Sequence, residues 1–101
     1  MLIWTETAKI DVINFINNSY SKASTKKYFN NLTFYLENLV HIKNLGKTIR
    51  VNYDSSVIKL LIYKKHKIYY LIRDYDIYIL TILHSKMNPY NIKKRLSEFI
   101  D

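Results

Sequence analysis

The hydrophobic pattern of this chain changes its period once, at Gly46, the only glycine among 101 residues. Before Gly46, apolar residues recur every three to four positions, which is the spacing of amphipathic helices. After Gly46, runs rich in β-branched and aromatic residues are separated by short polar segments, which is typical of strands joined by hairpins. Helices in the first half and adjacent strands in the second predict an α+β fold.

The predicted elements follow in a simple order. They are a strand at residues 2–4, a helix over 6–19 capped by Thr5, a second helix from about Ala23 to a stop at Gly46, strands at 47–51, 56–63, 67–73 and 76–84, and a short C-terminal helix that starts with Asn88 as its cap and Pro89 in its first turn. The helix pair is expected to pack antiparallel against a twisted antiparallel sheet of four to five strands. The last two strands are apolar on both faces, so we expect them to be central. No linker interrupts residues 1–101, which predicts a single domain.

Composition excludes several classes of chemistry. The chain has no cysteine, which rules out disulfides, thiolate metal sites and cysteine nucleophiles. Only eight acidic residues are present, and Asp74 and Asp76 occupy ordinary turn positions, so neither a metal nor another cofactor is expected. The N-terminus does not read as a signal peptide, and no apolar run approaches the roughly 20 residues of a membrane span. We therefore expect a soluble, cytoplasmic protein.

Positive charge is concentrated in the second half of the chain. The formal net charge is +8; residues 1–46 contribute five basic and three acidic side chains, and residues 47–101 contribute eleven and five. This asymmetry suggests a polyanionic partner, either nucleic acid or an acidic protein segment. Codon bias in an A/T-rich genome would explain the abundance of Lys, Asn, Ile and Tyr, but it explains the uneven distribution less well.

Four local motifs resemble those of one known family. They are "IWTETAKIDVINFI", "LVHIKNLGK", "HKIYYLI" and "IYILTILHSKMNP", and they span roughly residues 2–90. In this order and spacing they resemble the RelE/ParE family of toxins from bacterial type II toxin–antitoxin modules. The resemblance implies a small basic toxin held inactive by an antitoxin. RelE-like members bind the ribosomal A site and cut mRNA, whereas ParE-like members inhibit DNA gyrase.

Strand register provides a test of the candidate site. If an even-numbered loop closes the hairpin at "RDYD", Tyr70 pairs with Ile79 and Lys67 pairs with Ile82. Side chains alternate between the faces of a sheet, so Lys67 and His84 would then share one face and meet at one end of it. A loop with one residue more or fewer would separate them.

The resemblance also suggests roles for these residues. Lys67 stands where ribonuclease members usually have an arginine that contacts the scissile phosphate, and His84 matches a histidine that some members use as a general acid. Lys86 falls near a position that is often basic. Lysine in place of arginine loses the bidentate fork, and no acidic general base has a counterpart here. The predicted catalytic set is Lys67, His84 and Lys86.

Other residues are candidates for contacts with nucleic acid. Lys47 and Arg50 could grip flanking phosphates, and Tyr53 and Tyr90 could stack on bases. The full predicted binding set is Lys47, Arg50, Lys59, Arg73, Tyr53 and Tyr90. By contrast, Lys64, Lys65 and His66 are expected to form a solvated hairpin tip.

The sequence is compatible with three functions. The leading hypothesis is a ribosome-associated, metal-independent mRNA endoribonuclease that arrests translation. The second is a non-catalytic inhibitor of DNA gyrase, and the third is a basic nucleic-acid or protein docking module. For either toxin, the expected partner is an acidic, partly disordered antitoxin that folds as it binds.

Overall fold

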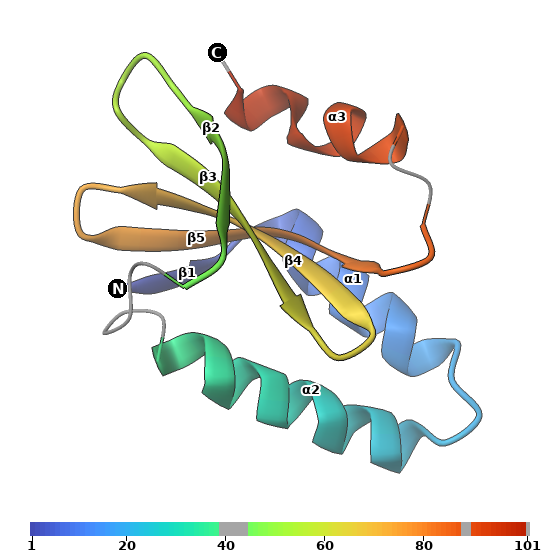
Figure 1. Ribbon diagram of the computed structural model, residues 1–101. Coiled ribbons are helices and arrows are strands. Elements are labelled where there is room, and N and C mark those ends of the chain that lie inside the picture. The colour runs from blue at the N-terminus through green and yellow to red at the C-terminus, as the bar shows by residue number, and fades with distance from the viewer. Residues whose placement is uncertain (39–44, 88–89, 101) are drawn as a thin grey trace.

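The computed structural model describes residues 1–38, 45–87 and 90–100, without the side chains of Tyr90 and Asn91. Its elements confirm the predicted α+β fold and its chain order (Figure 1). They are β1 (Leu2–Trp4), α1 (Glu6–Asn17), α2 (Lys22–Glu37), β2 (Lys47–Val51), β3 (Val57–Tyr63), β4 (His66–Arg73), β5 (Asp76–His84), α3 (Tyr90–Leu96) and a 3-10 turn, η2 (Ser97–Phe99).

The five strands form one sheet in the order β1-β5-β4-β3-β2. Strands β2 to β5 form an antiparallel meander, and β5 and β4 are central, as predicted. Strand β1 pairs with β5 in parallel, so the sheet is mixed rather than purely antiparallel. The parallel pairing arises because α1 and α2 intervene between β1 and the meander and let the chain return in the same direction.

Helix α1 begins at the predicted cap and lies against β5. The Thr5 hydroxyl oxygen accepts a hydrogen bond from the Ala8 N–H at 3.3 Å and donates to the Ile79 carbonyl at 2.7 Å. One side chain therefore both caps the helix and fixes its start to the sheet. Helix α2 follows after residues 18–21 and runs in roughly the opposite direction on the same side of the sheet (Figure 1).

Helix α2 does not extend to Gly46. Its last residue is Glu37, and Gly46 instead precedes β2 with a φ of +91°. A Cβ at Gly46 would lie 2.9 Å from both the Leu60 carbonyl oxygen and the Tyr70 hydroxyl, so this glycine permits a close approach to the sheet as well as the positive φ. Residues 39–44, which include His41, lie outside the described part of the chain.

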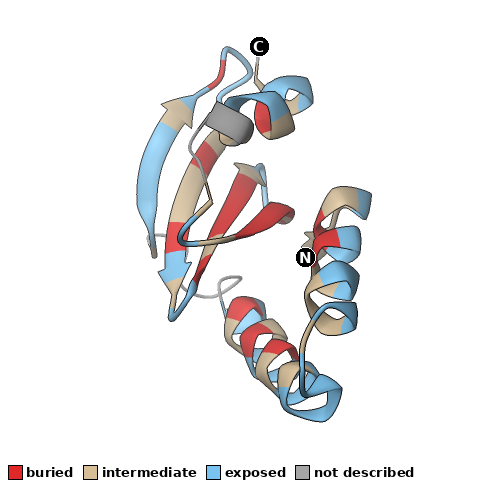
Figure 2. Ribbon diagram, turned by 90° about the vertical axis from the view of Figure 1, so that its right-hand side faces the viewer, coloured by how far each residue is buried: buried red, intermediate tan, exposed pale blue. Residues whose placement is uncertain are grey.

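Two buried clusters flank the sheet, one on each face (Figure 2). The larger lies between the sheet and the α1/α2 pair and includes Leu32, Leu36 and Ile68. The smaller lies under α3 and includes Leu83 and Leu96. We call these two sides the helix-pair face and the α3 face. No described helix has the length and apolar character needed to cross a membrane.

Candidate functional site

The predicted pairing of β4 with β5 holds near their connecting turn and then shifts. Tyr70 pairs with Ile79, as predicted, but the preceding residue, Tyr69, pairs with Thr81. Leu80 is therefore an extra residue on β5, which is a β-bulge. Beyond a bulge, the side chains of the longer strand change face relative to those of its partner.

This bulge separates Lys67 from His84. Lys67 pairs with Leu83 instead of the predicted Ile82, and His84 pairs with His66. Because paired residues share a face, His84 lies with His66 on the helix-pair face, while Lys67 lies on the α3 face. The prediction that Lys67 and His84 meet on one face was wrong.

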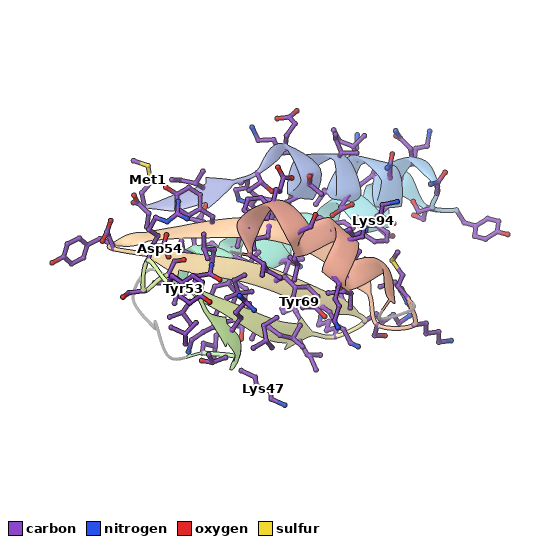
Figure 3. The ribbon with its side chains drawn as sticks, turned by 90° about the horizontal axis from the view of Figure 1, so that it is seen from above. Met1, Lys47, Tyr53, Asp54, Tyr69 and Lys94 are labelled. Atoms are coloured by element: carbon purple, nitrogen blue, oxygen red, sulfur yellow. The ribbon has the colours of Figure 1, made fainter. Side chains whose placement is uncertain are left out.

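The predicted cations divide between the two faces. The pairing of β2 with β3 and the alternation along β4 place most of them on the α3 face, and the pairing of β3 with β4 places Lys59 on the helix-pair face. Figure 3 shows Lys47 pointing outward from the sheet. The cations that share the α3 face are Lys47, Arg50, Lys67 and Arg73.

Part of the predicted binding set lies at the end of the sheet opposite to His66 and His84. Tyr53 is 94% exposed beside Asp54, and the Arg73 guanidinium lies 3.3 Å from the Asp54 carboxylate (Figure 3). Arg73 is seven residues along β4 from His66, a separation of roughly 23 Å. Tyr90 begins α3, but its side chain lies outside the described residues. The predicted residues therefore do not form one site.

A groove of about 760 Å³ opens at the end of the sheet that carries His84. Its walls come from α1, the α1–α2 connection, α2, the β3–β4 hairpin tip and the end of β5. The described residues that line it include Lys64 and Lys65 but no aspartate or glutamate. We call this feature the histidine groove.

His66 is a buried component of this groove, and the prediction that it is solvated at the hairpin tip was wrong. Only 8% of its surface is exposed, and its ring centroid lies 4.9 Å from that of Phe15 and 5.3 Å from that of Phe29. The helix pair covers this end of β4 with aromatic side chains. Lys64 and Lys65, the two turn residues before His66, are exposed as predicted.

Hydrogen bonds define the chemical form of both imidazoles. The Tyr28 hydroxyl oxygen lies 2.8 Å from His66 Nδ1 and 3.3 Å from the Tyr63 carbonyl oxygen. A carbonyl can only accept, so both contacts form together when His66 Nδ1–H donates to Tyr28 and Tyr28 donates to Tyr63. The Lys86 backbone N–H donates to His84 Nδ1 at 3.2 Å, which leaves the His84 proton on Nε2.

Burial controls the charge of His66. Removal from water is the main cause that lowers the pKa of His66 from 6.5 to about 4, and the electrostatic effects of His84 and Lys65 act in the same direction. At neutral pH this imidazole is therefore uncharged, and its unprotonated nitrogen can accept a hydrogen bond. The His66 and His84 rings meet edge to face with centroids 5.6 Å apart.

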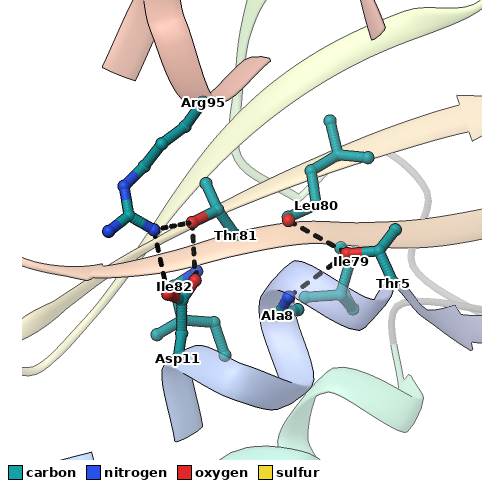
Figure 4. Close-up of polar contacts among 8 residues, drawn as sticks. All are labelled: Thr5, Ala8, Asp11, Ile79, Leu80, Thr81, Ile82 and Arg95. Carbon is teal, nitrogen blue, oxygen red and sulfur yellow. Dashed lines mark hydrogen bonds and ion pairs between the residues drawn. The ribbon is translucent and has the colours of Figure 1, made fainter. Parts of the chain in front are cut away.

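A largely buried network that sequence reasoning did not identify contacts β5 directly after its bulge (Figure 4). The carboxylate of Asp11 on α1, which is 8% exposed, accepts hydrogen bonds from the Thr81 hydroxyl at 2.7 Å and the Ile82 N–H at 3.1 Å. The other carboxylate oxygen of Asp11 lies 2.9 Å from Nη1 of Arg95 on α3. The sequence feature that could have revealed this network is Asp11, which follows Ala8 by three residues and so lies on the stripe of α1 that faces the core.

Within the described ranges, no group of three or more His, Asp or Glu side chains could hold a metal ion. A scan against protein-family models finds no match to this chain, and a search of curated proteins finds no similar sequence.

Proposed function

We propose that this chain is the toxin of a bacterial type II toxin–antitoxin module and acts as a metal-independent mRNA endoribonuclease on the ribosome. The order of its elements, the four motifs and the excess of basic residues in its second half support the toxin class. The observation that carries the nuclease activity is the pair of imidazoles in a groove with lysines at its edge.

The chemistry uses the 2′-hydroxyl of the RNA as its nucleophile. The 2′-oxygen forms a bond to the adjacent phosphorus while the bond from phosphorus to the 5′-oxygen breaks, which leaves a 2′,3′-cyclic phosphate and a 5′-hydroxyl. His66 Nε2 accepts the 2′-hydroxyl proton, the leaving 5′-oxygen takes a proton from solvent, and His66 returns its proton to solvent. The Nε2–H of His84 and the ammonium groups of Lys64 and Lys65 stabilise the charge on the phosphate.

Cleavage in a translating extract tests this activity. Addition of the purified protein should cut the mRNA, leave cyclic phosphate ends and continue in excess EDTA, because no step needs a metal. The control is the same extract with the protein denatured. Intact mRNA in the presence of folded protein, or cleavage abolished by EDTA, would contradict the proposal.

The second candidate is a toxin that inhibits DNA gyrase without chemistry. The separation of Lys67 from His84 favours it, because the structure does not form the pair of a phosphate-binding cation and an acid that the resemblance implies for a ribonuclease. This candidate predicts inhibited supercoiling by purified gyrase together with uncut mRNA. The two activities are measured in separate assays, so one result does not determine the other.

Exposed apolar side chains support the proposal of a bound antitoxin. Ile10 and Ile13 on α1 and Phe34 on α2 are exposed, and a groove of about 340 Å³ runs between the two helices. An amphipathic antitoxin segment would cover these side chains while its acidic residues meet the basic surface. Co-expression with the neighbouring reading frame should yield a complex, and recovery of the toxin alone would count against it.

A further inference from the structure

Two imidazoles with opposite hydrogen-bonding capacity line the histidine groove. Tyr28 engages Nδ1 of His66, and the Lys86 N–H engages Nδ1 of His84. The hydrogen-bond directions leave Nε2 of His66 as an acceptor and Nε2–H of His84 as a donor. A matching ligand therefore carries a hydroxyl donor close to an oxygen acceptor.

The charge and walls of the groove narrow the ligand class further. Lys64 and Lys65 are exposed at its edge, while the described lining has no carboxylate, which favours an anion. The rings of Phe15 and Tyr28, both partly exposed, line the same groove and offer apolar surface to a planar group. An anion joined to a planar base through a sugar combines these properties.

We propose that the histidine groove binds one nucleotide of single-stranded RNA. Its phosphate lies against Lys64, Lys65 and the Nε2–H of His84, and its ribose 2′-hydroxyl donates to Nε2 of His66. The base packs against the aromatic wall. This inference rests on the proposed function and deepens it, because it assigns the groove as the place where the reacting ribose and phosphate are held.

The 2′-hydroxyl distinguishes RNA from other anions. DNA supplies the same phosphate and bases, but it leaves the acceptor nitrogen of His66 without a donor. A partner peptide with an aromatic anchor could fill the walls, but it carries no ribose hydroxyl beside a phosphate. The groove should therefore prefer a ribonucleotide over its deoxy counterpart and over inorganic phosphate.

Adenosine 3′-monophosphate is a suitable probe because it carries the adjacent 2′-hydroxyl and phosphate but has no bond to a 5′-leaving group. In an NMR titration of the whole protein, this nucleotide should shift the ring signals of His66 and His84. It should bind about fivefold more tightly than 2′-deoxyadenosine 3′-monophosphate, the effect expected for one hydrogen bond. Inorganic phosphate should bind more weakly than either nucleotide.

A double variant and a matched control locate the binding. Lys64→Asn with Lys65→Gln removes the cations, and asparagine tolerates the positive φ of 51° at position 64. This variant should weaken binding at least tenfold, whereas Lys9→Gln, near the start of α1 and outside the lining of the groove, should leave it unchanged. Equal affinity for the ribo and deoxy nucleotides, no ring shifts up to about 10 mM nucleotide, or an equal loss of binding in Lys9→Gln would overturn the inference.

The nucleotide titration and the cleavage assay in the extract test separate claims. Nucleotide binding with uncut mRNA would retain the groove as an RNA site and reject the nuclease proposal. Cleaved mRNA without nucleotide binding would retain the nuclease and reject this groove as its site.

Discussion

Burial of His66 makes the stability of the fold depend on pH in the mildly acidic range. The pKa of His66 falls from 6.5 to about 4 in the folded chain, so the unfolded chain binds more protons between these values. The free energy of unfolding should therefore decrease as pH falls through this window, by on the order of 3 kcal/mol from this residue. Urea denaturation at several pH values measures the change.

The control for this prediction is His66→Phe. Phenylalanine keeps a ring beside Phe15 and Phe29 but does not titrate, so the variant should lose less stability between pH 6.5 and 4 than the wild type. Carboxylates contribute equally to both proteins and cancel in the comparison. Identical pH profiles for the two proteins would contradict the assigned pKa of His66.

The hydrogen-bond network predicts which nitrogen carries the proton in each ring. Long-range ¹H–¹⁵N spectra at pH 7.5 should report the Nδ1–H form for His66 and the Nε2–H form for His84. Tyr28→Phe removes the partner of His66 Nδ1 and should shift His66 towards its Nε2–H form without changing His84. If His66 of the wild type carries its proton on Nε2, then Tyr28 donates to His66 Nδ1 and the predicted hydrogen-bond direction is wrong.

At the scale of elements, alternation along the sequence predicted the strands and their order but not the face of His84. Counting residues from the turn correctly predicts that Tyr70 pairs with Ile79, because this part of the register depends only on the hairpin itself. The bulge at Leu80 is followed directly by Thr81, whose hydroxyl donates to the carboxylate of Asp11, about 70 residues earlier. A contact between segments so distant leaves no periodic signal in either one.

Asp11 should therefore contribute more to stability than its place in a surface helix suggests. Asp11→Ala leaves the Thr81 hydroxyl and the Ile82 N–H without their acceptor and removes the ion-pair partner of Arg95. We expect the free energy of unfolding to fall by about 2–4 kcal/mol, below the full range for a buried pair because Arg95 is partly exposed.

The matched control for Asp11→Ala is Asn14→Ala, an exposed position one turn later on the same helix. Its effect should stay within about 0.5 kcal/mol. Thermal and urea unfolding of both variants measure the difference. Equal stability of the two variants would mean that α1 and α3 do not depend on this carboxylate for their attachment to β5.

At the scale of the whole molecule, composition predicted the excess of positive charge but not which cations the fold brings together. The Ser85 N–H donates to the Lys65 carbonyl at 2.8 Å, which joins the end of β5 to the β3–β4 hairpin tip. This contact brings together cations from two separate stretches of the chain. They are Lys64 and Lys65 at the tip, Lys67 on the α3 face and Lys86 after β5.

This arrangement predicts the salt dependence of RNA binding. A single strand that leaves the histidine groove and passes around the hairpin tip would meet about four lysines, so the logarithm of its affinity should fall with the logarithm of salt concentration with a slope of about −3. Lys67→Gln should reduce the magnitude of that slope by about 0.7, because one phosphate contact is lost.

Lys9→Gln makes the same change of charge on α1, away from this path, and should leave the slope unaltered. Titration of a labelled nine-nucleotide RNA between about 50 and 200 mM salt compares the three proteins. If both variants lower affinity by the same factor, net charge rather than this path governs binding. A loss confined to Lys67→Gln, with nucleotide binding in the groove intact, would mean that the strand extends from one face of the sheet to the other around the tip.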